Sequence, residues 1–207
     1  MTRGKFITIE GMEGVGKSTN LQVIESFLAD SDIPFVTTRE PGGTPIAEDI
    51  RSLLLDHGTE PMEIMTELLL VFAARAQHVR RFIEPALDAG TWVVCDRFTD
   101  STWAYQGGGR GVPDHVIDDV ERAAIGGFAP DLTLVLDLDP EVGLARAAAR
   151  SEKDRFEREG LDFFRRVRAV YLDRARRFER MKVVDASQSI EVVGSTIRQV
   201  LAGEINR

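Results

Sequence analysis

The sequence predicts a single doubly wound α/β domain, with a mainly parallel five-stranded sheet and helices on both faces. Short, nearly continuous apolar runs alternate with longer amphipathic segments along most of the chain, a pattern typical of βαβ units. Hydrophobic residues make up 43% of the sequence, enough to bury a substantial core. The length of 207 residues fits one domain, which we expect to span residues 1–207.

The predicted strands are rich in β-branched and aromatic residues, as in TWVVC and LTLVLDL, which favour a buried sheet. They fall at residues 6–9, 35–39, 91–95, 132–138 and 182–184. The turn signal EPGG ends the second of them. The helices that we expect between the strands run from near Lys17 to about Ala29 and over residues 46–56, 62–88, 141–150, 162–180 and 190–201.

Composition limits the possible partners. The net charge of −8 and the pI near 5.0 argue against a nucleic-acid or membrane surface, because both bind basic footprints. No apolar run approaches the ~18 residues of a membrane span, and none resembles a signal peptide. Cys95 is the only cysteine, which fits a reducing compartment, so we expect a cytoplasmic protein. The three histidines lie far apart in the sequence, and we expect no structural metal.

The segment EGMEGVGKST, residues 10–19, contains a complete Walker A motif between a predicted strand and a predicted helix. Its glycines let several backbone N–H groups point at one anion, and the helix adds its positive dipole end. Lys17 is the predicted catalytic contact to the β- and γ-phosphates, and Ser18 is a predicted Mg²⁺ ligand. The sequence therefore predicts ATP and Mg²⁺ as ligands, with ATP held by Gly11, Met12, Glu13, Gly14, Val15, Gly16, Lys17, Ser18 and Thr19.

Other classes with this loop fit less well. The sequence has no Asn-Lys-x-Asp guanine motif, and Met12 stands where partitioning-type ATPases carry a second lysine. Motor and helicase domains read polymers with basic surfaces, whereas this chain is acidic. A small phosphotransferase remains the favoured class.

Two further strand ends carry candidate acceptor-binding residues, because parallel strands open onto one crevice at their carboxyl ends. Arg39 and Pro41 belong to the segment REPGG. The alternative interpretation of this segment is an ordinary turn with a surface arginine. Asp96 and Arg97 end the third strand, where Asp96 is a predicted Mg²⁺ ligand and Arg97 a phosphate ligand. Asp137, at the end of the fourth strand, is the alternative metal ligand.

A possible base-reading pair lies on the long predicted helix. Phe72 and Arg75 are three residues apart and share one helix face, so a ring to stack on a base lies beside a guanidinium. Taken alone, a core phenylalanine beside a surface arginine is the more common arrangement. Tyr105 and Gln106 precede three glycines, which favours a loop near a ligand, with a flexible surface turn as the alternative.

Taken together, EGMEGVGKST, TREPGGT, FAAR, DRF and AYQGGGRG resemble the bacterial thymidylate kinases, a family with the P-loop kinase fold, over nearly the whole chain. The resemblance implies a homodimer that transfers the γ-phosphate of ATP to dTMP with Mg²⁺. It also implies that Phe72 stacks on thymine and that Arg75 donates to a thymine carbonyl. The residues themselves suggest that Gln106 bonds a base edge. The third strand ends in DRF rather than in a histidine or tyrosine variant, a change that we expect to leave the site intact.

The same resemblance assigns roles to further acceptor-side residues. Arg39 and Arg97 would hold the dTMP phosphate, and Pro41 would follow a cis peptide bond. Tyr105 would lie against C2′ and disfavour a ribose hydroxyl. Glu13 would face away from the ATP phosphates and accept a hydrogen bond from the 3′-hydroxyl of dTMP, because a carboxylate aimed at phosphate would be costly. A solvated loop glutamate is the alternative for Glu13.

Phosphoryl transfer also needs positive charge on the transferring group, and the glycine loop has no arginine. The resemblance implies a mobile lid at about residues 146–160 that carries catalytic arginines. We expect Arg155 to contact the transition state and Arg150 to support it, against the alternative of a solvated basic helix face. Two other functions stay open at this point: a phosphotransferase for a different small acceptor, and an ATP-dependent switch driven by a protein partner.

Overall fold

The computed structural model describes residues 2–56, 60–149, 155–156 and 159–205. Its five strands form one sheet in the order β2-β3-β1-β4-β5, and every pair is parallel. This confirms the predicted α/β class and all five predicted strands. The strands are β1 (Phe6–Glu10), β2 (Phe35–Arg39), β3 (Trp92–Asp96), β4 (Leu132–Asp137) and β5 (Met181–Asp185).

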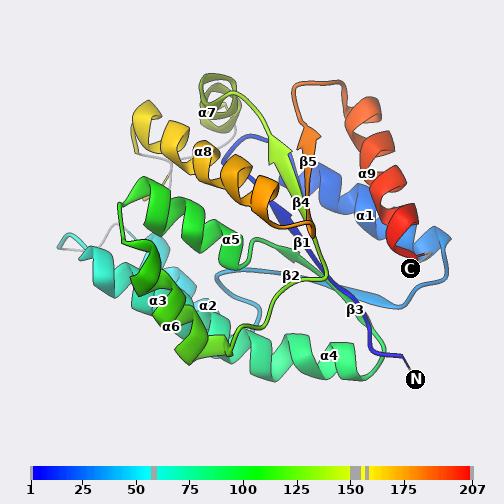
Figure 1. Ribbon diagram of the computed structural model, residues 1–207, viewed down its shortest axis with the longest axis horizontal. Helices are drawn as coiled ribbons and strands as arrows, with labels where there is room; N and C mark the ends of the chain where they lie inside the picture. Colours follow the sequence, from blue (N-terminus) through cyan, green and yellow to red (C-terminus); the bar gives the residue numbers. More distant parts are fainter. Residues whose placement is uncertain (1, 57–59, 150–154, 157–158, 206–207) are drawn as a thin grey trace.

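Helices surround this sheet (Figure 1). The helices of the first half are α1 (Lys17–Asp30), α2 (Pro45–Leu55), α3 (Ile64–His78), the π-helix η1 (Val79–Ile83) and α4 (Glu84–Asp88). Those of the second half are α5 (Thr99–Thr102), the π-helix η2 (Trp103–Gly109), α6 (Asp114–Ile125), α7 (Pro140–Ala148), α8 (Leu161–Arg177) and α9 (Ile190–Ile205). Within the described residues, no helix is long and apolar enough to span a bilayer.

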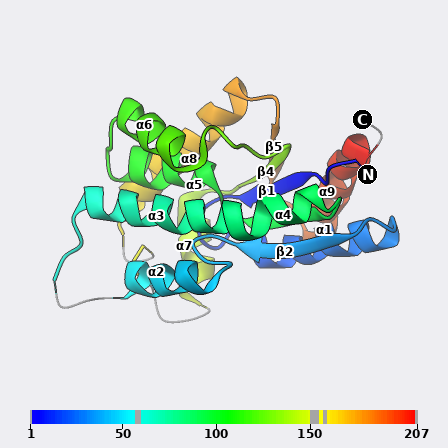
Figure 2. The same cartoon turned by 90° about the horizontal axis from the view of Figure 1, so that it is seen from below.

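The predicted helix over residues 62–88 is confirmed as a run of three segments, α3, η1 and α4, which Figure 2 shows end to end. The extra residue of a π turn breaks its regular period at Val79–Ile83. Helix α6 was not predicted, although its sequence carries a stop signal: Gly126 ends it in the left-handed conformation. The glycine-rich segment after Tyr105 was predicted as a loop, and this was wrong, because η2 includes Gly107–Gly109.

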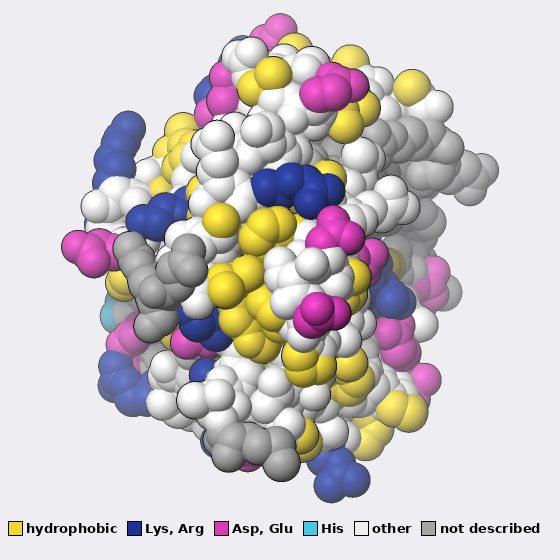
Figure 3. All heavy atoms as spheres, turned by 90° about the vertical axis from the view of Figure 1, so that its right-hand side faces the viewer, with side chains coloured by type: hydrophobic (Ala, Val, Ile, Leu, Met, Phe, Trp, Pro, Cys, Tyr) yellow, Lys and Arg dark blue, Asp and Glu magenta, His cyan; other side chains and the backbone are white. Residues whose placement is uncertain are grey.

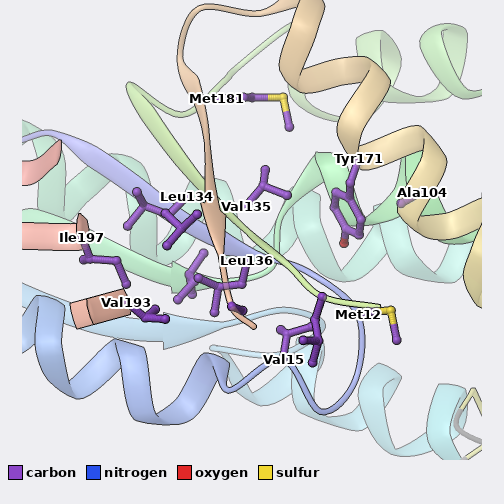
Figure 4. Packing of buried hydrophobic residues seen from close by; sticks show 14 of the residues in the cluster. Met12, Val15, Ala104, Leu134, Val135, Leu136, Tyr171, Met181, Val193 and Ile197 are labelled. Carbon is purple, nitrogen blue, oxygen red and sulfur yellow. The ribbon is translucent and has the colours of Figure 1, made fainter. Parts of the chain in front are cut away.

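Alternating side chains of β1 pack on opposite faces of the sheet. Ile7 and Ile9 belong to the hydrophobic cluster that includes Ile24 of α1, whereas Phe6 joins a second cluster with Ile83 and Leu87. The same alternation continues in β4. In Figure 4, Leu134 and Leu136 lie toward α9, and Val135 lies on the side of Tyr171 from α8. Helices therefore cover both faces, as predicted.

The strand register brings the carboxyl ends of three strands level. Asp96 of β3 lies opposite Ile9 of β1 and also opposite Arg39 of β2. The loops that follow these strands therefore leave the sheet at one edge, which is where open parallel sheets bind ligands. On the face of the molecule that carries α1 and α9, by contrast, basic and acidic side chains are interspersed with hydrophobic ones (Figure 3).

Candidate active site

A cavity of about 290 Å³ opens at this edge of the sheet. The loops after β1, β2 and β3 line it together with residues of α1, α2, α3, α5, η2 and α7 and with Phe156. The cavity collects most of the residues that the sequence predicts for a kinase site. Those that line it are Glu13, Gly14, Gly16, Lys17, Ser18, Arg39, Pro41, Arg75, Asp96, Arg97, Tyr105 and Gln106.

The loop after β1 presents its backbone to the cavity and buries its apolar side chains. Met12 and Val15 are 2% and 3% exposed and pack in the core, while Gly14 lies so close to Gly143 that a Cβ there would meet the Gly143 carbonyl oxygen at 1.9 Å. Gly14 and Gly16 both have positive φ, which glycine adopts without strain. The loop therefore closes around a space that backbone N–H groups can line.

Lys17 lies across its own loop. Its ammonium nitrogen donates to the carbonyl oxygens of Gly11 and Met12, both at 3.2 Å. Burial lowers the pKa of Lys17, and the nearby Arg97 guanidinium lowers it further, while Asp96 and Glu13 oppose the shift. A bound anion beside this ammonium would oppose that lowering of its pKa.

The carboxylate of Glu13 points toward the β3 end of the cavity. Arg97 donates to Glu13 Oε1 at 2.7 Å, and the Tyr105 hydroxyl donates to Oε2 at 2.6 Å. The Arg97 guanidinium also stacks 4.9 Å from the centre of the Tyr105 ring. The alternative of a solvated loop glutamate is therefore wrong, because this side chain is only 12% exposed and is held by two partners.

Arg97 leaves the strand in an unusual backbone conformation. Its φ of 71° lies in the left-handed region, which is rare for a residue other than glycine and is found most often at functional sites. Besides Glu13, its guanidinium donates to the Gly11 carbonyl oxygen at 3.0 Å and to Ser101 Oγ at 3.3 Å. Burial disfavours the charged guanidinium, but Tyr105 and Glu13 raise the pKa of Arg97 well above its ordinary value.

Beneath Arg97, the buried carboxyl group of Glu10 fixes the turn after β3. It accepts hydrogen bonds from the Phe98 backbone N–H at 2.7 Å, the Ser101 hydroxyl at 2.6 Å and the Tyr171 hydroxyl at 2.9 Å. Burial, and then the charge of Asp100, raise the pKa of Glu10 to about 7. Sequence reasoning gave Glu10 no role, although it directly precedes the glycine loop.

Asp96, next to Arg97, presents an oxygen with no protein partner. Within the described residues, its Oδ1 atom is buried and accepts no hydrogen bond, and Asp96 lines the cavity together with Ser18. Asp137, the alternative metal ligand, is instead held by Arg168 at 2.6 and 2.9 Å. The structure therefore favours Asp96 over Asp137 as the carboxylate available to a cation.

The turn after β2 supplies a second cluster of charged groups. Pro41 follows a cis peptide bond, as the resemblance implies. The Arg39 side chain is half exposed and forms an ion pair with Glu48 at 2.9 Å. Arg51 of α2 also lines the cavity and donates to the Pro41 carbonyl oxygen at 2.9 Å. Sequence reasoning missed Arg51, whose signal is its helical position shortly after REPGG.

Arg75 lies in a buried network behind this turn. Its Nε donates to Glu40 at 2.7 Å, Nη1 to the Thr102 hydroxyl at 2.8 Å and Nη2 to the Phe98 carbonyl oxygen at 3.0 Å. The other carboxylate oxygen of Glu40 contacts His78 Nδ1 at 3.0 Å. These bonds fix the guanidinium while it lines the cavity, and a guanidinium has five N–H groups to offer.

Phe72 is buried and is not among the residues that line the cavity. Its side chain is 2% exposed and packs with Leu68, Val112 and Ile117, while the neighbouring Val71 lines the cavity. The Arg75 guanidinium lies 4.9 Å from the Phe72 ring, so the predicted pairing of the two side chains exists, but in the protein interior. Val71, one residue earlier in the helix, lines the cavity, and the stacking of Phe72 on the base stays a prediction from the sequence.

Arg155 is held by residues of α2 and α3. It is not among the residues that line the cavity, and its side chain donates to the Leu54 carbonyl oxygen at 2.9 Å and to Glu67 at 2.7 Å. Its neighbour Phe156 does line the cavity. Arg150 falls outside the described residues, as do residues 151–154 and 157–158 of the predicted lid. In this arrangement of the described residues the Arg155 side chain is bound to α2 and α3, and its contact with the transition state stays a prediction from the sequence.

Comparison with known proteins agrees with these motifs. The family model described as Thymidylate kinase matches residues 9–197. The chain is 55% identical to a thymidylate kinase of Pseudomonas putida strain GB-1, an alignment that covers 99% of this chain and 98% of the relative. It is 52% identical to a thymidylate kinase of Hahella chejuensis, with 99% of both chains covered. These matches span the loop, both strand ends and η2, and the chain belongs to the thymidylate kinase family.

Proposed function

We propose that the protein transfers the γ-phosphate of ATP to dTMP and releases dTDP and ADP. The observation that carries this proposal is the position of Glu13. Its carboxylate belongs to the phosphate-binding loop but is turned away toward Arg97 and Tyr105, on the acceptor side of the cavity. One residue of the donor loop therefore also belongs to the acceptor pocket, as direct transfer between two bound nucleotides requires.

On the donor side, the loop backbone from Gly11 to Thr19 would hold the ATP phosphates, with Lys17 beside the β- and γ-phosphates. Ser18 and Asp96 would hold Mg²⁺ together with phosphate oxygens and water, because Mg²⁺ binds through few protein carboxylates. The orphaned, buried Oδ1 of Asp96 fits such a ligand. When bound, Mg²⁺ would neutralise charge on the phosphates. No group of three or more acidic, histidine or cysteine side chains that could hold a metal by itself occurs in the described part of the chain.

On the acceptor side, Arg97, Arg39 and Arg51 would surround the dTMP phosphate. Glu13 would accept a hydrogen bond from the 3′-hydroxyl, and the Tyr105 ring would lie against C2′. These residues bring the acceptor phosphate to the loop without a general base, since that phosphate is already an anion. Lys17 and Arg97 supply the positive charge nearest to the transferring group, and Arg150 stays a prediction from the sequence.

The base would lie between α3 and η2. The Arg75 guanidinium is fixed by three protein bonds and lines the cavity, so its remaining N–H groups can donate to a thymine carbonyl. Val71 and Gln106 complete the wall, and Phe72 supports it from the interior. A donor held this rigidly favours a carbonyl at one ring position and rejects an amino group there.

We also propose a homodimer. Several of the most exposed large apolar side chains fall on α2 and α3, which pack against each other: Ile46, Leu53, Ile64, Met65 and Leu69. Exposed apolar clusters of this kind are typical of protein interfaces. Light scattering after gel filtration should give a mass near twice 23.0 kDa, and a mass of one chain would contradict the proposal.

The test of the proposed function is ADP release from ATP and Mg²⁺ in the presence of dTMP, dUMP, UMP, AMP or no acceptor. We expect strong stimulation by dTMP, weaker stimulation by dUMP, which lacks the thymine methyl group, and almost none by UMP, whose 2′-hydroxyl would meet Tyr105. Equal release with all five would leave ATP binding in place and overturn the kinase assignment in favour of a partner-driven ATPase.

A further inference from the structure

Glu67, in the first turn of α3, is a buried carboxylate outside the residues discussed as ligands of either nucleotide. Its side chain is 1% exposed. It accepts hydrogen bonds from Gln106 Nε2 at 2.7 Å, from Arg155 Nη1 at 2.7 Å and from Arg110 Nε at 3.4 Å. A buried charge of this kind is costly unless it is paired, so the three donors explain how the carboxylate is tolerated.

Two of these partners lead directly to the acceptor side of the cavity. Gln106 itself lines the cavity. Arg155 precedes Phe156, which also lines the cavity and packs edge-on against the Tyr105 ring, with centroids 5.9 Å apart. The Arg155 guanidinium lies 4.6 Å from the Phe156 ring and bonds the Leu54 carbonyl oxygen of α2. Residues 155–156 are therefore fixed on the acceptor side mainly through Glu67, Leu54 and Tyr105.

Arg110, the third partner of Glu67, contacts the same part of the structure. Arg110 forms a second ion pair with Glu159 and lies over the rings of Phe156 and Phe163, at 5.7 and 5.1 Å. The hydrogen-bond partners of Glu67 lie between 39 and 88 residues away from it in the sequence. One carboxylate thus joins α3, η2 and residues 155–156 around a single half of the cavity.

We propose that Glu67 is a positioning residue for the acceptor nucleotide. It holds the Gln106 amide toward the base and keeps Arg155 and Phe156 against the acceptor half of the cavity. In this account, which rests on the proposed function, Arg155 serves acceptor binding through Glu67 and not the transition state. Loss of the carboxylate should weaken dTMP binding while leaving the ATP-binding loop intact, because the hydrogen-bond partners of Glu67 in the described part of the chain lie outside residues 10–19.

The test uses Glu67→Gln, which keeps the shape and removes the charge, together with Arg155→Met, which keeps much of the side-chain length, and the double variant. We expect each single change to raise KM for dTMP by about tenfold or more, since hydrogen bonds to a buried charge are strong. KM for ATP should change by less than about twofold. The double variant should be no worse than the poorer single variant, because both changes break the same contact.

Glu141→Gln is the matched control, because Glu141 forms an exposed ion pair with Arg165, which is not one of the Glu67 partners. It should leave every parameter unchanged. Should Glu67→Gln fold poorly, as judged by its melting temperature, Arg155→Met provides the decisive measurement, since its side chain is 20% exposed.

Three results would overturn the inference. The first is a KM for dTMP within twofold of wild type in both single variants. The second is multiplication of the two single effects in the double variant, which would show independent roles. The third is a lower kcat in Arg155→Met with unchanged KM for dTMP, which would return Arg155 to the transition state. A wild-type enzyme without dTMP-dependent ADP release would instead overturn the proposed function, and the inference with it.

Discussion

At the scale of single residues, charged groups in this site are fixed by one another before any ligand binds. Glu13 is bonded by Arg97 and Tyr105, and Arg97 also bonds the backbone of the glycine loop. Groups that are already oriented cost little reorganisation when charge moves during the reaction. The acid in the glycine loop is thus a structural link between the two halves of the cavity.

Glu13→Gln should raise KM for dTMP by about tenfold or more and change KM for ATP much less, because it removes a charged partner of Arg97 and the acceptor for the 3′-hydroxyl. Steady-state kinetics with each substrate varied in turn measures both constants. Equal increases of the two constants would mean that Glu13 serves the loop itself.

Glu10 gives a prediction for stability against pH. Its pKa is raised from 4.5 to about 7 in the folded protein, so the folded state binds the extra proton between these values. Glu10 therefore contributes most to the free energy of unfolding below about pH 4.5. This contribution is lost as pH rises through about 7. The full loss corresponds to roughly 3 kcal/mol.

Glu10→Gln cannot titrate, so the free energy of unfolding of wild type relative to this variant should fall as pH rises from 5 to 8. Urea denaturation of both proteins at several pH values measures this difference. A difference that stays constant over that range would show that Glu10 does not take up a proton on folding.

At the scale of elements, α3 shows which structural features a sequence pattern predicts and which it does not. Apolar periodicity predicted the helix, and the motif FAAR predicted the pairing of Phe72 with Arg75. Successive residues of a helix point about 100° apart, so the orientation of α3 about its axis decides which side chains line the cavity. That orientation depends on packing against Val112 and Ile117 far along the chain, which a local pattern does not contain.

Substitutions at these neighbouring positions separate the two roles. Phe72→Leu should lower the free energy of unfolding by on the order of 1 kcal/mol and leave KM for dTMP nearly unchanged. Val71→Ala should raise KM for dTMP several-fold, because it removes apolar contact from the cavity wall. Denaturation and kinetics on both variants provide the comparison. A larger increase in KM for Phe72→Leu would instead support stacking of Phe72 on the base.

The glycines of η2 give a second prediction at this scale. A Cβ at Gly109 would lie 2.4 Å from the Phe163 ring, so Gly109→Ala should destabilise the protein by about 1–3 kcal/mol. Gly203 in α9 has nothing within 4 Å, and Gly203→Ala should stabilise the protein by up to about 1 kcal/mol. Thermal unfolding of the two variants should move in opposite directions. A stable Gly109→Ala variant would contradict the close packing of η2 on α8.

At the scale of the whole molecule, the parallel sheet brings distant segments to one edge. The strands and the charged residues at their ends could be predicted because strand ends, glycine loops and turns are local features. The position of Arg155 could not be predicted, since it depends on a contact with Glu67 across 88 residues. Arg51 and Glu10 were missed for a similar reason: their roles follow from neighbours supplied by the fold.

The central claim is direct transfer between two nucleotides in one cavity, and a labelling experiment tests it most directly. The protein would be mixed with ATP carrying ³²P in the γ-phosphate, Mg²⁺ and dTMP, and the products would be separated. We predict that the label appears in dTDP in step with ADP release and that little appears as inorganic phosphate. Label found in inorganic phosphate, with dTMP unchanged, would contradict the account.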